Sequence, residues 1–309
     1  MRIPRLFVRT EPAALDERTR ESLAWAAGFF DGEGWANRSG RGVQARINQA
    51  GLKGVPEVLT KFQRIVGVGR IRGPVIIEGR QPLYHWIATS RPDLTEVVER
   101  IGPWLCPVKR AEFERTLGAP PPPVVWPGSM SEELAWAGGF FDGEGSTCLD
   151  KHRTHANFFV PVLYVPQAAA QGIAPELVRL QNAIGFGTIS GLRKAKPPGT
   201  PYRRWRVFTI DKVFRALHML WPFIGEVKRK QAQRAMQIVL TQPDLVRGNP
   251  AFGVAGARYC LRGHDKWNAR VRPFKGRGKN DADPMNHLRQ CLACVREDAQ
   301  TKRNKKRRP

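Results

Sequence analysis

Two hydrophobic periods alternate along the chain, and they predict helices and strands in a fixed order. Residues 22–32 are apolar on nearly every side and end at glycine, which is typical of a buried helix. Residues 43–49, "VQARINQ", alternate apolar and polar side chains with the period of a strand. Residues 55–67 are amphipathic with proline in the first turn, which favours a second helix. Two further strands and two further helices are expected over residues 68–73, 82–89, 91–105 and 107–117.

The same order of elements returns in the second half of the chain. The phrase "LAWAAGFFDGEGW", which begins at Leu23, returns as "LAWAGGFFDGEGS" at Leu134. One duplication with small insertions explains why the matches keep their order. The predicted fold is an α+β fold of two tandem αββαββα repeats related by pseudo-twofold symmetry. The matched pairs, at offsets of 111 to 119, are Glu33 with Glu144, Gln49 with Gln167, Trp86 with Trp205, and Lys109 with Lys228.

Composition marks the boundaries between the repeats and their neighbouring segments. The stretch "GAPPPPVVWPGSMS" contains consecutive prolines, which favour a semi-stiff linker. The repeat pattern stops near residue 245, and a second linker leads to a short cysteine-bearing module. The expected domains are an N-terminal extension (1–21), repeat 1 (22–118), a proline-rich linker (119–130), repeat 2 (131–245), a linker (246–257), a zinc-binding module (258–299) and a basic tail (300–309).

Small residues form a stripe on each repeated helix. Ala24 and Gly28 lie four residues apart in the first copy, as Ala135 and Gly139 do in the second. Stripes of this kind let two helix backbones approach closely. If the two helices pack along their stripes, their C-terminal ends meet and the two motif glutamates lie close together. Two such carboxylates repel unless cations lie between them, and Mg²⁺ prefers oxygen ligands of this kind.

The repeated phrase resembles a known motif. The segments "AGFFDGEG" and "GGFFDGEG" resemble the LAGLIDADG motif of homing endonucleases, and the duplicated pattern is similar to the single-chain, two-repeat members of that family over about residues 22–240. The resemblance implies that the last acidic residue of each motif, Glu33 or Glu144, binds a catalytic Mg²⁺ or Mn²⁺ ion. Two acids at a pseudo-twofold centre can then serve one DNA strand each.

The resemblance also implies residues that order water near the scissile phosphate. A glutamine at the end of the second strand and a lysine near the last helix have this role in the family. A basic residue just after the glutamine falls on Lys53 in the first copy, whereas the second copy has Gln171. By motif position the glutamines and lysines are Gln49, Gln167, Lys109 and Lys228.

Polar side chains on the predicted strands are candidates for reading DNA. A two-stranded ribbon fits the major groove, where base pairs are distinguishable. Alternation places the candidate side chains of each strand on one face of the sheet, while Trp205 and Val207 are expected in the core. The two copies differ most along these strands, so we expect a long asymmetric target. The DNA-binding candidates are Gln44, Arg46, Asn48, Arg70 and Arg72 on the strands of repeat 1, Lys53 after its second strand, and Arg204 and Arg206 in repeat 2.

The charge balance indicates a polyanionic partner. The 309 residues include 51 Lys and Arg against 27 Asp and Glu, a formal net charge of +24. Such an excess opposes a compact state, and nucleic acid or an anionic membrane is the usual reason for it. No apolar run is long enough to span a bilayer, and "MRIPRLFVRT" lacks the apolar core of a signal peptide. We therefore expect a monomeric, intracellular protein that is not secreted and whose partner is double-stranded DNA.

Cysteines near the C-terminus predict a metal site. "CLRGH" and "CLAC" are separated by a 26-residue spacer, and three thiols with one imidazole suit tetrahedral Zn²⁺. His287 competes as the fourth ligand. Residues 258–309 carry 16 basic and 5 acidic residues, so this module is expected to bind DNA. Cys106 and Cys148 are expected to be structural. The predicted zinc ligands are Cys260, His264, Cys291 and Cys294.

These observations predict a site-specific, metal-dependent endonuclease that hydrolyses phosphodiester bonds in double-stranded DNA. Two alternatives share the expected fold. One is an RNA-splicing maturase, whose partner is RNA, and the other is a DNA-binding regulator without cleavage. Regulators of this fold typically lose the acids, whereas Glu33 and Glu144 are both present. No intein splice junctions are evident, so a free-standing or intron-encoded protein of a mobile genetic element is expected.

Overall fold

The computed structural model describes residues 20–40, 42–125, 127–152, 155–168, 172–194 and 199–241, with residues 296, 299, 300 and 303. The predicted N-terminal extension before residue 20, the second linker, the zinc ligands with His287, and Gln171 lie outside these residues. The chain divides into two compact units, Met1–Cys148 with Val162–Ala235, and Leu149–Pro161 with Met236–Pro309. Both motif helices belong to the first unit.

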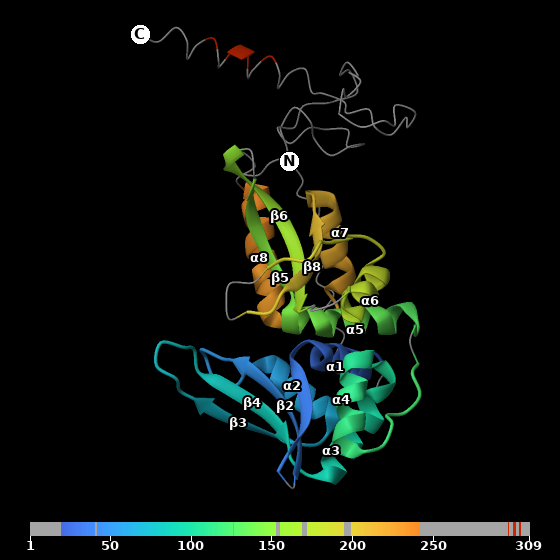
Figure 1. Ribbon diagram of the computed structural model, residues 1–309. Helices are drawn as coiled ribbons and strands as arrows, with labels where there is room; N and C mark the ends of the chain where they lie inside the picture. The colour runs from blue at the N-terminus through green and yellow to red at the C-terminus, as the bar shows by residue number, and fades with distance from the viewer. Residues whose placement is uncertain are drawn as a thin grey trace. The chain divides into compact units, whose positions relative to one another are not determined.

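Each repeat contains a motif helix, four strands and three further helices (Figure 1). Two helices follow the last strand, as expected for residues 91–105 and 107–117, and in repeat 1 a 3₁₀ turn at Gly102–Trp104 separates them. Repeat 1 comprises α1 (Arg20–Glu33), β1 (Gly34–Ser39), β2 (Gly42–Ala50), α2 (Glu57–Val66), β3 (Arg70–Val75), β4 (Leu83–Ala88), α3 (Arg91–Ile101) and α4 (Pro107–Leu117). Repeat 2 comprises α5 (Met130–Glu144), β5 (Ser146–His152), β6 (His155–Ala168), α6 (Pro175–Ile184), β7 (Thr188–Ile189), β8 (Tyr202–Phe208), α7 (Ile210–Leu220) and α8 (Glu226–Thr241).

Local signals explain where several helices begin and end. Ser129 caps α5 and forms a reciprocal capping box with Glu132, so the helix starts directly after the proline linker. Gly67 and Gly185 end the matched helices α2 and α6 in the left-handed conformation that glycine adopts without strain. Among the described residues no helix is both long enough and apolar enough to cross a membrane.

Each repeat builds one four-stranded sheet with the same topology. The strand orders are β1-β2-β4-β3 and β5-β6-β8-β7. Ile47 of β2 pairs with Trp86 of β4, and Val165 of β6 pairs with Trp205 of β8. All four side chains are fully buried, which confirms that Trp205 belongs to the core. Neighbouring residues along a strand face opposite sides of the sheet, so the charged residues next to these four in sequence lie on the face away from the core.

The two motif helices pack directly against each other through their glycines. A β-carbon at Gly28 would lie 2.0 Å from the carbonyl oxygen of Trp136, and one at Gly139 would lie 1.9 Å from that of Trp25. Only glycine therefore allows this approach, as the small-residue stripe predicted. Gly138 has a different neighbour, since a β-carbon there would lie 2.5 Å from Cβ of Phe223.

Candidate functional site

The packing of α1 on α5 brings the ends of the two motif helices together. Glu33 is the last residue of α1 and Glu144 is the last residue of α5. A β-carbon at Gly143 would lie 3.0 Å from Cγ of Glu33, and one at Gly32 would lie 3.2 Å from Cγ of Glu144. Each glutamate thus lies against the glycine that precedes the other, and the pair forms the centre of the candidate site.

The pKa values of these two carboxyls are raised, mainly by burial. Burial raises the pKa of Glu144 to about 7, and the nearby charge of Glu33 adds to the rise. Burial also raises the pKa of Glu33, but a hydrogen bond from Gln49 opposes that rise by stabilising the carboxylate. A cation between the two groups would remove the repulsion and favour both charged forms.

Two lysines supply positive charge beside the glutamates. The Lys228 ammonium donates a hydrogen bond of 2.6 Å to the carbonyl oxygen of Gly145, directly after Glu144. Burial lowers the pKa of Lys228, while the charges of Asp142, Glu33 and Glu144 oppose this. The charge of Lys109 also lowers the pKa of Glu144, and the Lys109 ammonium lies 3.0 Å from Oε1 of Glu112.

The matched glutamines are placed differently relative to the glutamates. Gln49 lies opposite Tyr84 near the end of β2 and bonds to Glu33. Gln167 occupies the corresponding position opposite Arg203, but among the described residues it is not one of the groups that act on the Glu144 carboxyl. Lys53 is exposed. A hydrogen bond from Lys230 lowers the pKa of the surface residue Glu226, and the charge of Lys53 adds to this effect. The structure therefore brings together Glu33, Glu144, Gln49 and both lysines.

The two glutamates fit a hard divalent cation. They are largely buried carboxylates that repel each other, which is the donor chemistry that Mg²⁺ prefers. The described part of the chain contains no group of three or more His, Cys, Asp and Glu residues that could hold a metal. The remaining ligands of a bound ion would therefore have to come from water or from the substrate.

The face of the first sheet opposite the core carries the predicted polar residues. Gln44, Arg46 and Asn48 alternate with the buried residues of β2, as expected. The Arg46 guanidinium donates to Oδ1 of Asn48 at 2.8 Å, and Nδ1 of His85 lies 2.7 Å from the same oxygen. Burial and the charge of Arg46 lower the pKa of His85, which favours its neutral ring. His85 was not predicted, although its place beside Trp86 in an alternating strand would have indicated this face.

Strand pairing shows that this polar face continues across the first sheet, and the second sheet has a similar face. Arg70 lies opposite Ile87, and Arg72 lies opposite His85, so both belong to the face that carries Arg46. In repeat 2, Arg204 and Arg206 alternate with the buried residues of β8. The Arg204 guanidinium lies 5.0 Å from the ring centre of Tyr164 and 5.1 Å from that of Tyr202.

Two further acidic residues of the motif are fully buried and were not predicted to have a role. Burial raises the pKa of Asp31 to about 7 and that of Asp142 to about 6. Indole N–H groups and backbone amides donate to both carboxylates. Because the tryptophan of the motif occurs in both copies, at Trp25 and Trp136, the repeated phrase itself contained the signal for this arrangement.

We expect Glu144→Gln to stabilise the protein over wild type by an amount that grows with pH. The pKa of Glu144 rises from 4.5 to about 7 on folding. Between these values the folded state binds more protons than the unfolded state, so wild-type stability falls as pH rises. The variant lacks this titration, and its advantage should reach roughly 1 to 3 kcal/mol near pH 8. Urea unfolding without divalent ions across this range tests the prediction, and parallel pH profiles of the two proteins would contradict it.

Comparison with known proteins identifies the fold. No protein-family model and no curated protein matches the chain. Among solved structures, the LAGLIDADG meganuclease I-AabMI bound to uncleaved DNA aligns with a TM-score of 0.53 and 17% identity, covering 73% of this chain and 93% of that one. The LAGLIDADG homing endonuclease I-GzeII in complex with its DNA target aligns at 0.53 and 13% identity, covering 74% and 93%. The LAGLIDADG meganuclease I-CpaMI bound to uncleaved DNA aligns at 0.52 and 12% identity, covering 72% and 93%. The chain therefore has the two-repeat LAGLIDADG fold.

Proposed function

We propose that this protein is a site-specific, metal-dependent endonuclease that hydrolyses phosphodiester bonds in double-stranded DNA. The observation that carries the proposal is the pair of glutamates at the ends of the packed motif helices, with two lysines and Gln49 beside them. The similar solved structures are endonucleases bound to DNA, which supports the same substrate class here. The pseudo-twofold arrangement lets a monomer act on both strands.

The proposed chemistry assigns a role to each of these groups. Bound Mg²⁺ or Mn²⁺ would activate water and stabilise charge on the phosphate oxygens. Glu33 and Glu144 would hold the metal, and in its absence burial, together with the charge of Glu33, keeps Glu144 partly protonated near neutral pH. Lys109 and Lys228 would add positive charge where negative charge develops. Gln49, which bonds to Glu33, would orient water beside one phosphate, and Gln167 would have this role on the other side only after substrate binds.

Sequence reading would come from the polar sheet faces. On the first sheet, Gln44 and the Arg46–Asn48 pair lie on the same face as Arg70 and Arg72. Arginine and asparagine side chains pair with guanine and adenine edges in the major groove. Arg204 and Arg206 would act from the second sheet. Because the two faces carry different residues, we propose a long asymmetric target.

Incubation of the protein with a library of randomised duplexes and Mg²⁺ tests the function directly. We expect recovery of one family of cut sequences, with both strands broken. Glu33→Gln is the matched control and should yield no cut product. Binding without cutting would favour a regulator, and selective binding of a structured RNA would favour a splicing maturase.

We expect Lys228→Met to lower single-turnover cleavage by about ten- to a hundred-fold while changing DNA affinity little, because a charge aimed at the transition state acts mainly on the rate. Lys228 is largely buried and contacts the backbone beside Glu144, so it is poorly placed as a general phosphate anchor. Lys230→Met is a suitable control, since that exposed lysine pairs with Glu226 on the surface. An equal loss of affinity and rate in Lys228→Met would mark the lysine as an anchor.

We further propose that the C-terminal module binds one Zn²⁺ ion through Cys260, His264, Cys291 and Cys294 and adds contacts to the DNA backbone. Its basic excess supports this, because each neutralised phosphate releases counterions and steepens the dependence of affinity on salt. A chain that ends near residue 245 should therefore bind DNA more weakly, with a shallower salt slope, and still cleave. Unchanged affinity and slope would show that the module does not hold DNA. Metal analysis of the full chain tests the zinc site, with Cys291→Ser as control.

A further inference from the structure

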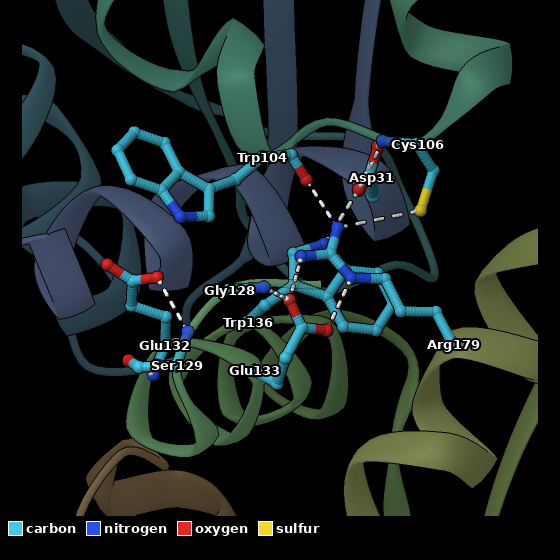
Figure 2. A network of polar contacts seen from close by, with 9 residues as sticks. All are labelled: Asp31, Trp104, Cys106, Gly128, Ser129, Glu132, Glu133, Trp136 and Arg179. Atoms are coloured by element: carbon cyan, nitrogen blue, oxygen red, sulfur yellow. Dashed lines mark hydrogen bonds and ion pairs between the residues drawn. The ribbon is translucent and has the colours of Figure 1, made fainter. Parts of the chain in front are cut away.

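The first acidic residue of each motif, Asp31 or Asp142, is buried and connects one repeat to the other. The Trp136 indole, from repeat 2, donates a 2.8 Å hydrogen bond to Asp31 of repeat 1 (Figure 2). The Trp25 indole, from repeat 1, donates a 3.0 Å bond to Asp142 of repeat 2. Each tryptophan therefore reaches across the helix pair to the aspartate of the other motif, and the two contacts are related by the pseudo-twofold symmetry.

Each aspartate also binds the backbone at the start of a lysine-bearing helix. Both carboxylate oxygens of Asp31 accept from the backbone N–H of Cys106, at 3.1 Å each, and Cys106 caps α4. Those of Asp142 accept from the backbone N–H of Gly225, at 2.8 and 2.9 Å, directly before α8. Lys109 is the third residue of α4, and Lys228 is the third residue of α8. Each lysine therefore lies three residues after the backbone N–H that the aspartate binds.

A cationic side chain, buried in one case and half-buried in the other, completes each contact. Arg179 of repeat 2 lies 4.2 Å from the ring centre of Trp136 and donates to the backbone oxygen of Trp104 in repeat 1 (Figure 2). Its other nitrogens bind both oxygens of Glu133 at 2.9 Å. Lys61 of repeat 1 corresponds to Arg179 at an offset of 118. Its ammonium lies 3.6 Å from the ring centre of Trp25 and 3.3 Å from the carbonyl oxygen of Phe223 in repeat 2.

We propose that Asp31 and Asp142 are positioning residues, each held by the tryptophan of the opposite repeat, that fix the start of the helix carrying the lysine of their own repeat. This inference rests on the proposed endonuclease function. A carboxylate that accepts a bifurcated bond from one amide N–H and a further bond from a rigid indole leaves the helix start little freedom. Because catalysis falls steeply when a group moves by about an ångström, loss of the indole bond should act on Lys109 or Lys228 selectively.

Strand-resolved cleavage separates positioning from general destabilisation. Single-turnover reactions on a duplex with each strand labelled give the cleavage rate of each strand. Lys109→Met should lower the cleavage rate of one strand. Trp136→Phe should lower the rate of that same strand by about ten-fold and the rate of the other strand by less than about two-fold. Trp25→Phe should instead lower the cleavage rate of the strand that Lys228→Met affects. Trp86→Phe is the matched control, since that buried indole donates to the carbonyl oxygen of Val68 within repeat 1 and should affect neither strand.

A double-mutant cycle sharpens the result. If the tryptophan acts through the lysine, Trp136→Phe should cause no further loss on that strand in the Lys109→Met background. Equal slowing of both strands by each tryptophan variant, or independent losses in the cycle, would overturn the inference. A wild-type protein that cuts no duplex would instead overturn the proposed function.

Hydrogen exchange tests the same inference without cleavage. Trp136→Phe should speed exchange of the backbone amides of residues 106–110 and leave residues 225–229 unchanged, because the variant loses the hydrogen bond to Asp31 and keeps the one from Trp25 to Asp142. Trp25→Phe should give the reverse pattern, and Trp86→Phe should leave both segments as in wild type. Uniform acceleration in both segments, or none in either, would overturn the inference.

Discussion

Glu33→Gln should abolish double-strand cleavage while leaving DNA binding largely intact. The substitution keeps the shape of the side chain but removes one of the two charges that would hold the metal. Without the metal to stabilise charge in the transition state, the activation free energy of cleavage should rise by several kcal/mol, which lowers the rate on the order of a thousand-fold. Affinity should be unchanged or slightly higher, because a negative charge near the phosphates is lost. Cleavage and filter-binding measurements on the same protein preparation test both expectations.

Glu96→Gln is the matched control for this experiment. Glu96 forms an exposed i,i+4 pair with Arg100 on α3, and such surface pairs contribute little. It should bind and cleave as wild type does, which would separate the effect of the site from that of any carboxylate. Glu144→Gln should behave like Glu33→Gln. Wild-type cutting rates in either motif variant would contradict the metal assignment.

Gly139→Ala should destabilise the protein by about 3 kcal/mol or more, because the added methyl group overpacks a tight contact between two backbones. Its β-carbon would lie 1.9 Å from the carbonyl oxygen of Trp25, so one motif helix must move away from the other. The gain in helix propensity, about 1 kcal/mol, is too small to offset this. Displacement of the helices would also separate the motif glutamates. Urea unfolding monitored by circular dichroism measures the loss.

Gly191→Ala is the control for this substitution. A β-carbon at Gly191 meets no atom within 4 Å, so the same chemical change should leave the unfolding midpoint nearly unchanged. Gly28→Ala should resemble Gly139→Ala, because its β-carbon would lie 2.0 Å from the carbonyl oxygen of Trp136. A midpoint equal to that of wild type in either motif variant would show that the helices do not pack as described.

Hydrophobic periodicity and the internal repeat were sufficient to predict the order of elements and the meeting of the motif helices. Side-chain direction follows directly from the period of a helix or a strand, so local patterns placed Trp205 in the core and Arg46 on the opposite face. The duplication then paired Glu33 with Glu144, because similar helices with small-residue stripes can approach closely. The zinc ligands remain a prediction from spacing and residue type.

Other features depended on how the elements meet, and no local pattern contains that information. The indole of Trp25 bonds to Asp142, 117 residues away, only because the motif helices cross at their glycines. Gln49 bonds to Glu33, whereas in the described part of the chain Gln167 is not among the groups that act on Glu144, although the sequence matches the two glutamines. Strand register, helix crossing and the small insertions between repeats set these distances. The sequence alone thus determined which residues face the centre of the protein, and the tertiary structure decided which of them touch.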